Sequence, residues 1–263
     1  MKEISPTSQQ PPRLHLLDEA RGFAVLCMVF FHAFFTMSVT FGMPAGTALL
    51  QFFLPAELYF AGFFILLSGF ACRLSRSNAK RGGILLGIAL GLTGVTYLLE
   101  RMGMEGTVIW FGILHLLSLC MLLFALLRPL LDKIHPLLGA LVCAALFVFF
   151  FPISDRMLGI PGIAAISLPD GWYQTDLLAP LGLYTDRFAS ADYFPLLPWL
   201  FLFLCGSFLG VSVKKGLCPR FFYQMHLRPL AFVGRHALII YIAHQPVIFA
   251  LLWLVQTAMN IGG

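Results

Sequence analysis

Apolar residues fill this chain in seven long blocks, and most of the charged residues fall in or beside the segments between them. A helix of about 20 apolar residues is long enough to cross the ~30 Å hydrocarbon core of a bilayer. The pattern therefore predicts an all-α polytopic membrane protein with about seven transmembrane helices. Five glycines in and beside the third block suit close helix packing. The predicted spans are residues 20–41, 52–72, 83–99, 108–127, 136–151, 194–213 and 232–257.

The composition excludes a soluble protein. Of the 263 residues, 59% are hydrophobic and 11% are charged, whereas soluble domains carry about 25% charged residues. Because no sizeable polar region lies outside the apolar blocks, we expect a single transmembrane domain over residues 1–263. Residues 1–12 are polar and proline-rich, which indicates a mobile tail.

Positive charge gathers on one side of the predicted topology. Fourteen of the 17 Lys and Arg residues lie near the start of the first span, or in and beside the connections after the second, fourth and sixth spans. Cytoplasmic loops are enriched in Lys and Arg, so we expect a cytoplasmic N-terminus and a C-terminus outside. The same bias accounts for the net charge of +5 without a nucleic-acid partner.

The longest connection, residues 152–193, is then extracytoplasmic. It holds five aspartates and several prolines and glycines. A loop of this length is often functional, as a lid for example, and the alternative is a solvated loop at the membrane surface. Its acidity favours a basic acceptor such as an amine.

The first span places a cation and a histidine on one stripe. Arg21 and His32 are eleven residues apart, which is three helical turns with a remainder of about 20° and a rise of about 16 Å. Ionisable side chains inside a membrane are costly, so His32 is a functional candidate that could act as a general base. The alternative is a neutral imidazole hydrogen-bonded between helices.

Two further histidines lie in apolar blocks. His115 lies early in the fourth span, and His244 precedes Pro246 in the seventh. Three intramembrane histidines exceed what packing needs, so at least one is expected to be functional. No pair of cysteines shows metal-ligand spacing, and the sequence contains no H-E-x-x-H motif and no acidic metal cluster, so we expect no metal site.

Arg73 and Arg76 follow the second span directly. On a helix that continues through them, positions i and i+3 point the same way, and two guanidiniums suit a phosphate group. The alternative is ordinary anchoring at the cytoplasmic surface.

Several motifs, in order along the chain, resemble one family of membrane enzymes. They are LDEARGFAVLCMVFFH (17–32), LYFAGFFILLSGF (58–70) followed by Arg73 and Arg76, FGILH (111–115), YFPLLPW (193–199) and FVGRHALIIYIAHQP (232–246). Together they are similar to the heparan-α-glucosaminide N-acetyltransferase catalytic-domain family and to the related type-three membrane acyltransferases.

The resemblance implies a reaction and a set of residues. Such proteins take an acyl group, usually acetyl, from cytoplasmic acetyl-CoA and deliver it to a sugar amine or hydroxyl on the other side. Arg21 and His32 match the Arg/His spacing important for acyl transfer in the type-three enzymes. Arg73 and Arg76 resemble an R-x-x-R element tied to acyl-CoA use. We expect the CoA phosphates to lie near these two residues, with Arg21 or Arg235 as a further contact.

The sequence thus favours an integral acyltransferase of a bacterial-type plasma membrane. His32 would be the general base, with His115 and His244 orienting it or binding the acceptor. The expected partners are the acyl-CoA donor, a cell-surface sugar or amino-sugar acceptor and membrane lipid, and a homodimer is among the assemblies left open. One alternative is a proton-coupled transporter that uses the intramembrane histidines as a relay. Another is a non-catalytic membrane subunit.

Overall fold

The computed structural model describes residues 13–214 and 219–261. Within these ranges, seven helical segments are long and apolar enough to cross a membrane, so the predicted all-α polytopic fold is confirmed. They are His15–Thr40, Pro44–Leu74, Asn78–Arg101, Ile113–Leu131, Pro136–Asp155, Leu196–Val213 and Ala237–Met259. The orientation of the termini stays a prediction, and the expected mobile tail at 1–12 lies outside the described residues.

The chain divides into two compact units. The first, Met1–Ala61 with Cys218–Gly263, joins both ends of the chain, and we call it the terminal unit. The second, Gly62–Leu217, is the central unit.

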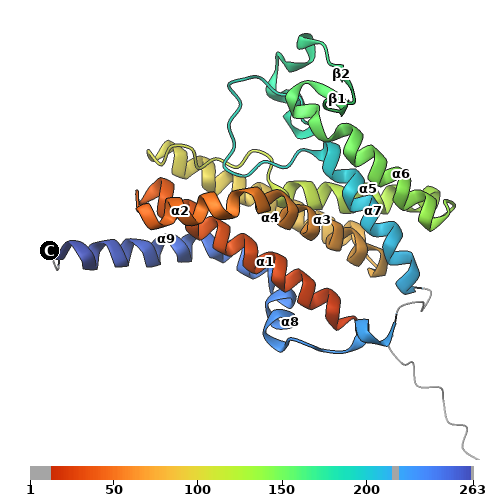
Figure 1. The fold of residues 1–263 in the computed structure, drawn as a ribbon, viewed down its shortest axis with the longest axis horizontal. Helices are drawn as coiled ribbons and strands as arrows, with labels where there is room; N and C mark the ends of the chain where they lie inside the picture. Colours follow the sequence, from red (N-terminus) through yellow and green to blue (C-terminus); the bar gives the residue numbers. More distant parts are fainter. Residues whose placement is uncertain (1–12, 215–218, 262–263) are drawn as a thin grey trace, which may run out of the picture. The chain divides into compact units, whose positions relative to one another are not determined.

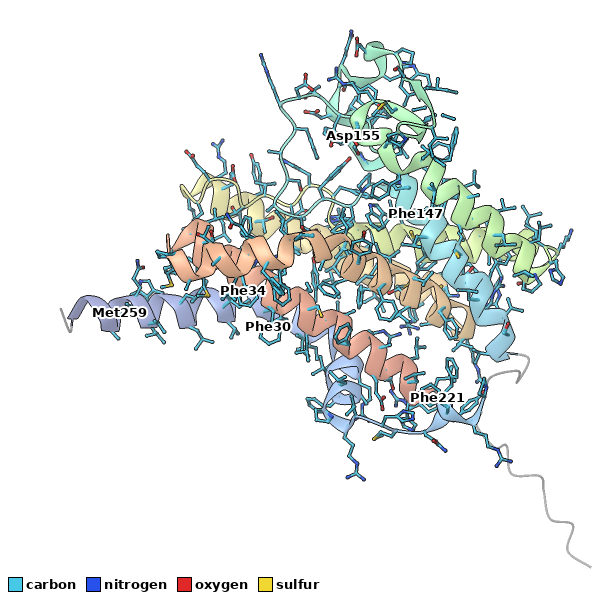
Figure 2. The ribbon with its side chains drawn as sticks, in the orientation of Figure 1. Phe30, Phe34, Phe147, Asp155, Phe221 and Met259 are labelled. Carbon is cyan, nitrogen blue, oxygen red and sulfur yellow. The ribbon has the colours of Figure 1, made fainter. Side chains whose placement is uncertain are left out.

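The terminal unit is built around α1 (His15–Phe35). A π-helical turn (Thr36–Thr40) continues α1, and α2 (Pro44–Phe53) and a short 3₁₀ turn (Leu54–Ala56) follow. The aromatic residues Phe30 and Phe34 project from α1 (Figure 2) with their rings 6.2 Å apart, and Phe34 also contacts Phe53 of α2.

The other end of the chain supplies α8 (Arg228–Arg235) and α9 (Ala237–Ile261). Figure 1 shows α8 folded against the N-terminal half of α1. The two helices approach closely because Gly22 and Gly234 face the partner backbone. The predicted seventh span started at residue 232 and is wrong at this boundary, because the chain breaks at His236 between the two helices.

Glu19 of α1 anchors the segment that leads into α8. Its carboxylate is buried and accepts hydrogen bonds from the backbone N–H groups of His226 (2.7 Å) and Leu227 (3.0 Å). It also lies 3.5 Å from the ring of His226. Burial of a carboxylate is costly unless it is hydrogen-bonded, and these two donors fix the point at which α8 begins.

The central unit contains the rest of α3 (Glu57–Leu74), α4 (Asn78–Arg101), α5 (Ile113–Leu131), α6 (Pro136–Phe150) and α7 (Leu196–Lys214). The pairs α4–α5 and α6–α7 pack most extensively. Phe147 of α6 (Figure 2) lies with its ring 5.4 Å from that of Trp199 on α7. Where α3 crosses α7, a Cβ added at Gly69 would collide with the carbonyl of Phe203.

The glycines of α4 behave differently from the prediction. Only Gly82 meets a neighbouring helix, against side chains of α5. A Cβ at Gly83, Gly87, Gly91 or Gly94 would meet nothing within 4 Å. The expected role of these four glycines in close packing is therefore wrong, and α4 packs on α5 through other residues such as Leu85 and Ala89.

Residues 152–193 form a folded connection. A 3₁₀ turn (Phe151–Asp155) leads into an antiparallel hairpin of β1 (Met157–Ile160) and β2 (Ala164–Ser167), with Met157 opposite Ser167. Figure 2 marks Asp155 where α6 gives way to the hairpin. Two more 3₁₀ turns follow, Asp170–Tyr173 and Asp176–Leu181.

Two tyrosines, Tyr173 buried and Tyr193 partly buried, hold this connection together. Tyr173 donates its hydroxyl hydrogen bond to the carbonyl of Ile153, and Tyr193 donates to that of Ala179. Burial raises the pKa of both phenols above the usual range, so both stay protonated donors at neutral pH.

The end of the connection also caps α5. The carboxylate of Asp192 accepts from the backbone N–H of Ile113 at 3.0 Å, and Phe111 pairs with Tyr193 in an isolated bridge. The predicted fourth span began at residue 108 and is wrong there, because residues 108–112 pair with the connection and α5 starts only after Gly112.

Candidate functional site

Helix α1 carries the two residues of the predicted stripe. It runs unbroken from His15 to Phe35, so Arg21 and His32 lie about three turns apart on one helix face. The Arg21 guanidinium lies 3.6 Å from the carboxylate of Asp18, which also receives a 2.8 Å hydrogen bond from Arg13. This end of α1 therefore holds a small charged cluster, and His32 lies in the apolar half.

His32 is tied to α9 through a glutamine. The side-chain amide nitrogen of Gln245 lies 3.1 Å from Nδ1 of His32, and the hydroxyl of Thr36 lies 3.4 Å from the amide oxygen. The bridge joins three polar side chains inside two apolar helices. Unpaired polar groups are costly in such surroundings, so the bridge holds the imidazole in one orientation.

His244 completes an imidazole pair. Its ring centroid lies 4.9 Å from that of His32, with the ring planes tilted by 49°. The side chain is buried, and Nδ1 faces the carbonyl of Tyr241 one turn earlier in α9. Among the described residues, the buried Nε2 atom of His244 has no hydrogen-bond partner.

The backbone next to His32 is also unusual. At Thr36 the α-helix widens into a π turn, closed by a 3.1 Å bond from the N–H of Phe41 to the carbonyl of Thr36. Short π segments are frequent at functional sites. Here the π turn begins four residues after His32, with the residue that contacts Gln245.

His115 has a different setting, in the central unit. Its Nδ1 accepts from the backbone N–H of Gly112 at 3.2 Å, and its Nε2 lies 3.1 Å from the hydroxyl of Thr93. That hydroxyl in turn donates to the carbonyl of Ile109 at 2.7 Å. Both ring nitrogens are thus engaged in closing the start of α5 against α4.

Arg73 is also engaged within the central unit. It is 2% exposed, pairs with the carboxylate of Asp132 and donates from Nε to the carbonyl of Ser207 at 3.1 Å. The ring centroids of Phe124 and Phe208 lie 5.1 and 5.8 Å from the guanidinium carbon of Arg73. Cation–π contacts of this kind add to the ion pair.

The predicted arginine pair is therefore not formed as expected. Helix α3 ends at Leu74, so Arg73 and Arg76 do not share a continuing helix face. Arg76 is exposed, and so is Arg235 on α8, whose Nε donates to the carbonyl of Ala231. Within residues 13–214 and 219–261, no group of three or more His, Cys, Asp or Glu residues is arranged to hold a metal ion.

Comparison with known proteins bears on this arrangement. The family model of the heparan-α-glucosaminide N-acetyltransferase catalytic domain matches residues 13–246. The chain belongs to this family. The match contains both members of the imidazole pair and ends just after Gln245, and it makes the protein an acetyltransferase embedded in the membrane. No curated protein and no solved structure matches the chain.

Gln245 and Thr36 were missed in the sequence. The signal for Thr36 is its spacing, since His32 and Thr36 are four residues apart and share a helix face. The signal for Gln245 is an uncharged polar residue in an otherwise apolar stretch, directly after His244. Neither signal says which helices meet, so the bridge itself could not be predicted.

Proposed function

We propose that this protein transfers an acetyl group from cytoplasmic acetyl-CoA to an amine or hydroxyl of an extracytoplasmic, glycan-type acceptor. The observation that carries the proposal is the His32–His244 pair, with ring centroids 4.9 Å apart, inside the residues that match the acetyltransferase family. A neutral imidazole can take a proton from an attacking amine or hydroxyl.

The position of the pair suits acyl transfer. His32 lies in the apolar half of α1 and His244 is buried. Exclusion of bulk water limits hydrolysis of a reactive thioester and strengthens hydrogen bonds to developing charge. We therefore assign the reacting end of the donor to the neighbourhood of this pair, with Arg21 near the surface on the same helix. His115 is assigned a structural role, because its ring nitrogens already bond within the central unit.

Exposed arginines fit the charged end of acetyl-CoA. Arg76 in the central unit and Arg235 in the terminal unit each present a guanidinium, the group best suited to phosphate. We propose each as a separate contact for CoA phosphates. Arg73 has a structural role instead, because its contacts with Asp132 and Ser207 hold the C-terminal end of α3, which precedes Arg76 in the chain.

The charge bias of the sequence supports the direction of transfer. Positive-inside topology places Arg76 and Arg235 on the cytoplasmic side, where acyl-CoA is available. The same topology places the folded connection with its five aspartates outside, where it would meet a sugar or amino-sugar acceptor. We propose a bacterial-type plasma membrane as the location.

The test is acetyl transfer by the purified full-length protein in liposomes. Acetyl-labelled acetyl-CoA is supplied with glucosamine as the amine acceptor, and labelled product is counted for the wild type and for His32→Ala. Transfer that needs His32 supports the proposal. Full activity of His32→Ala overturns the role of the pair, and a folded wild type that transfers nothing but takes up solute along a pH gradient supports the transporter instead.

A further inference from the structure

Gln245 determines where His32 carries its proton. The amide nitrogen of Gln245 faces Nδ1 of His32, and the amide oxygen faces the hydroxyl of Thr36. An amide nitrogen can only donate a hydrogen bond, so Nδ1 of His32 is the acceptor. A neutral imidazole has one N–H, and in His32 that N–H is therefore on Nε2.

The opposite holds for His244. Its Nδ1 faces the backbone carbonyl of Tyr241, and a carbonyl oxygen can only accept. Nδ1 of His244 therefore carries the proton and Nε2 carries the lone pair. That Nε2 is buried and has no partner among the described residues. An unsatisfied buried polar atom is unfavourable, and such an atom in a catalytic protein is a candidate for contact with substrate.

The two imidazoles thus have complementary tautomers. We infer that His244 is the general base of the transfer, that His32 is a hydrogen-bond donor to the acetyl carbonyl oxygen, and that Gln245 is the positioning residue that keeps His32 in its donor form. This inference rests on the proposed function. It divides between two residues a role that the sequence assigned to His32 alone.

The reaction balances with these roles. The acceptor nitrogen or oxygen attacks the thioester carbon, a C–N or C–O bond forms, and the C–S bond to CoA breaks. His244 Nε2 takes the proton that the acceptor loses, and the His32 Nε2–H stabilises the charge that develops on the carbonyl oxygen. His244 then gives the proton to the departing thiolate, so that CoA leaves as a thiol and His244 is neutral again.

Substitutions with glutamine separate the two roles. The amide nitrogen of glutamine occupies the place of imidazole Nε2 and can donate there, but it cannot take up a proton. We expect His32→Gln to keep acetyl transfer within about tenfold of the wild type, and His32→Ala to lose about 10²–10³-fold, as for a lost oxyanion donor. We expect His244→Gln to lose about 10²–10⁴-fold, as for a lost general base. The reverse order, with His244→Gln active and His32→Gln inactive, overturns the inference.

Nitrogen NMR on histidine-labelled protein tests the tautomers without relying on activity. The wild type should show His32 protonated at Nε2 and His244 at Nδ1. Gln245→Glu presents a carboxylate, which accepts only, so His32 should move its proton to Nδ1 and transfer should fall at least tenfold. Gln245→Met is the control that removes the bridge without imposing the other tautomer.

The outcomes distinguish this inference from the proposed function. A folded wild type that transfers no acetyl group from acetyl-CoA overturns the proposed function. A wild type that transfers acetyl but has the opposite tautomers overturns only the division of roles. Unchanged tautomers and full transfer in Gln245→Glu overturn the role of Gln245. A positioning role requires the His32 tautomer to follow the hydrogen-bonding character of residue 245, whereas a purely structural role does not.

Discussion

Gly22 on α1 and Gly234 on α8 face each other at a backbone-to-backbone contact. A Cβ at Gly22 would collide with the carbonyl of Leu230, and one at Gly234 would collide with the carbonyl of Asp18. Small residues permit this approach, and the contact lies one residue from Arg21. The helix that carries the predicted stripe is thus held near its charged end by a segment more than 200 residues later in the chain.

Adding one methyl group at this contact should destabilise the terminal unit. We expect Gly22→Ala or Gly234→Ala to cost at least about 1–3 kcal/mol, because the collision is with backbone rather than with a flexible side chain. Thermal unfolding in detergent measures the effect. Gly87→Ala is the matched control: its Cβ meets nothing within 4 Å, and alanine is favoured over glycine within a helix. Equal stability of Gly22→Ala and Gly87→Ala would show that α1 and α8 are not in backbone contact.

Apolar periodicity was enough to predict the seven spans and the placement of Arg21 and His32 on one helix. The spans follow from the lengths of the apolar blocks. The placement of Arg21 and His32 follows from the helix itself, which fixes the angle and the rise between residues eleven apart. The predicted starts at residues 108 and 232 were wrong because tertiary contacts decide where α5 and α9 begin. Phe111 pairs with Tyr193, and the chain turns at His236 to place α8 on α1.

The partners of the ionisable residues could not be predicted. Composition shows that His115 and Arg73 lie in apolar surroundings, but it does not show that Thr93 and Asp132 meet them. Each contact joins helices whose relative placement is set by packing over their whole length. The same limit hid Gln245, although its neighbour His244 was recognised from the sequence.

His115 should matter for stability more than for acetyl transfer. His115→Ala leaves the N–H of Gly112 and the hydroxyl of Thr93 without their shared partner, at a cost of about 1–3 kcal/mol. We expect a lower unfolding temperature and transfer per folded molecule within about tenfold of the wild type. Thr93→Val removes the hydrogen bond between Thr93 and His115 and should also lower the unfolding temperature, by a smaller amount. Loss of transfer in a His115→Ala protein of normal stability would place His115 in the chemistry instead.

The folded connection depends on Arg156. Its guanidinium bonds to Asp170 at 3.2 Å and Asp186 at 2.6 Å and lies 5.3 Å from the ring centroid of Tyr173. Because both carboxylates are exposed, the pairs are screened by salt and add little to global stability. We expect Arg156→Gln to increase amide hydrogen exchange across residues 170–186 while leaving the unfolding temperature nearly unchanged. Arg187→Gln, on the same connection, is the control, and exchange unchanged in Arg156→Gln would contradict the bridging role.

Arg76 should contribute to acetyl-CoA binding without contributing to the fold. Its side chain is exposed beyond the end of α3, and a charged hydrogen bond to phosphate is worth about 1.5 kcal/mol or more. We expect Arg76→Ala to weaken acetyl-CoA binding about tenfold with an unchanged unfolding temperature, measured by calorimetric titration and thermal unfolding. Arg101→Ala removes an exposed arginine at the far end of α4 and should leave binding intact.

Arg73→Ala, in the same assays, distinguishes the structural role of Arg73 from the binding role of Arg76. It removes a buried guanidinium from Asp132, from the carbonyl of Ser207 and from two aromatic rings. Buried ion pairs are destabilising to break, so the yield of folded protein should fall before binding can be measured. A stable Arg73→Ala protein with lost acetyl-CoA binding would reverse the assignment, because it would place Arg73, rather than Arg76, on the donor.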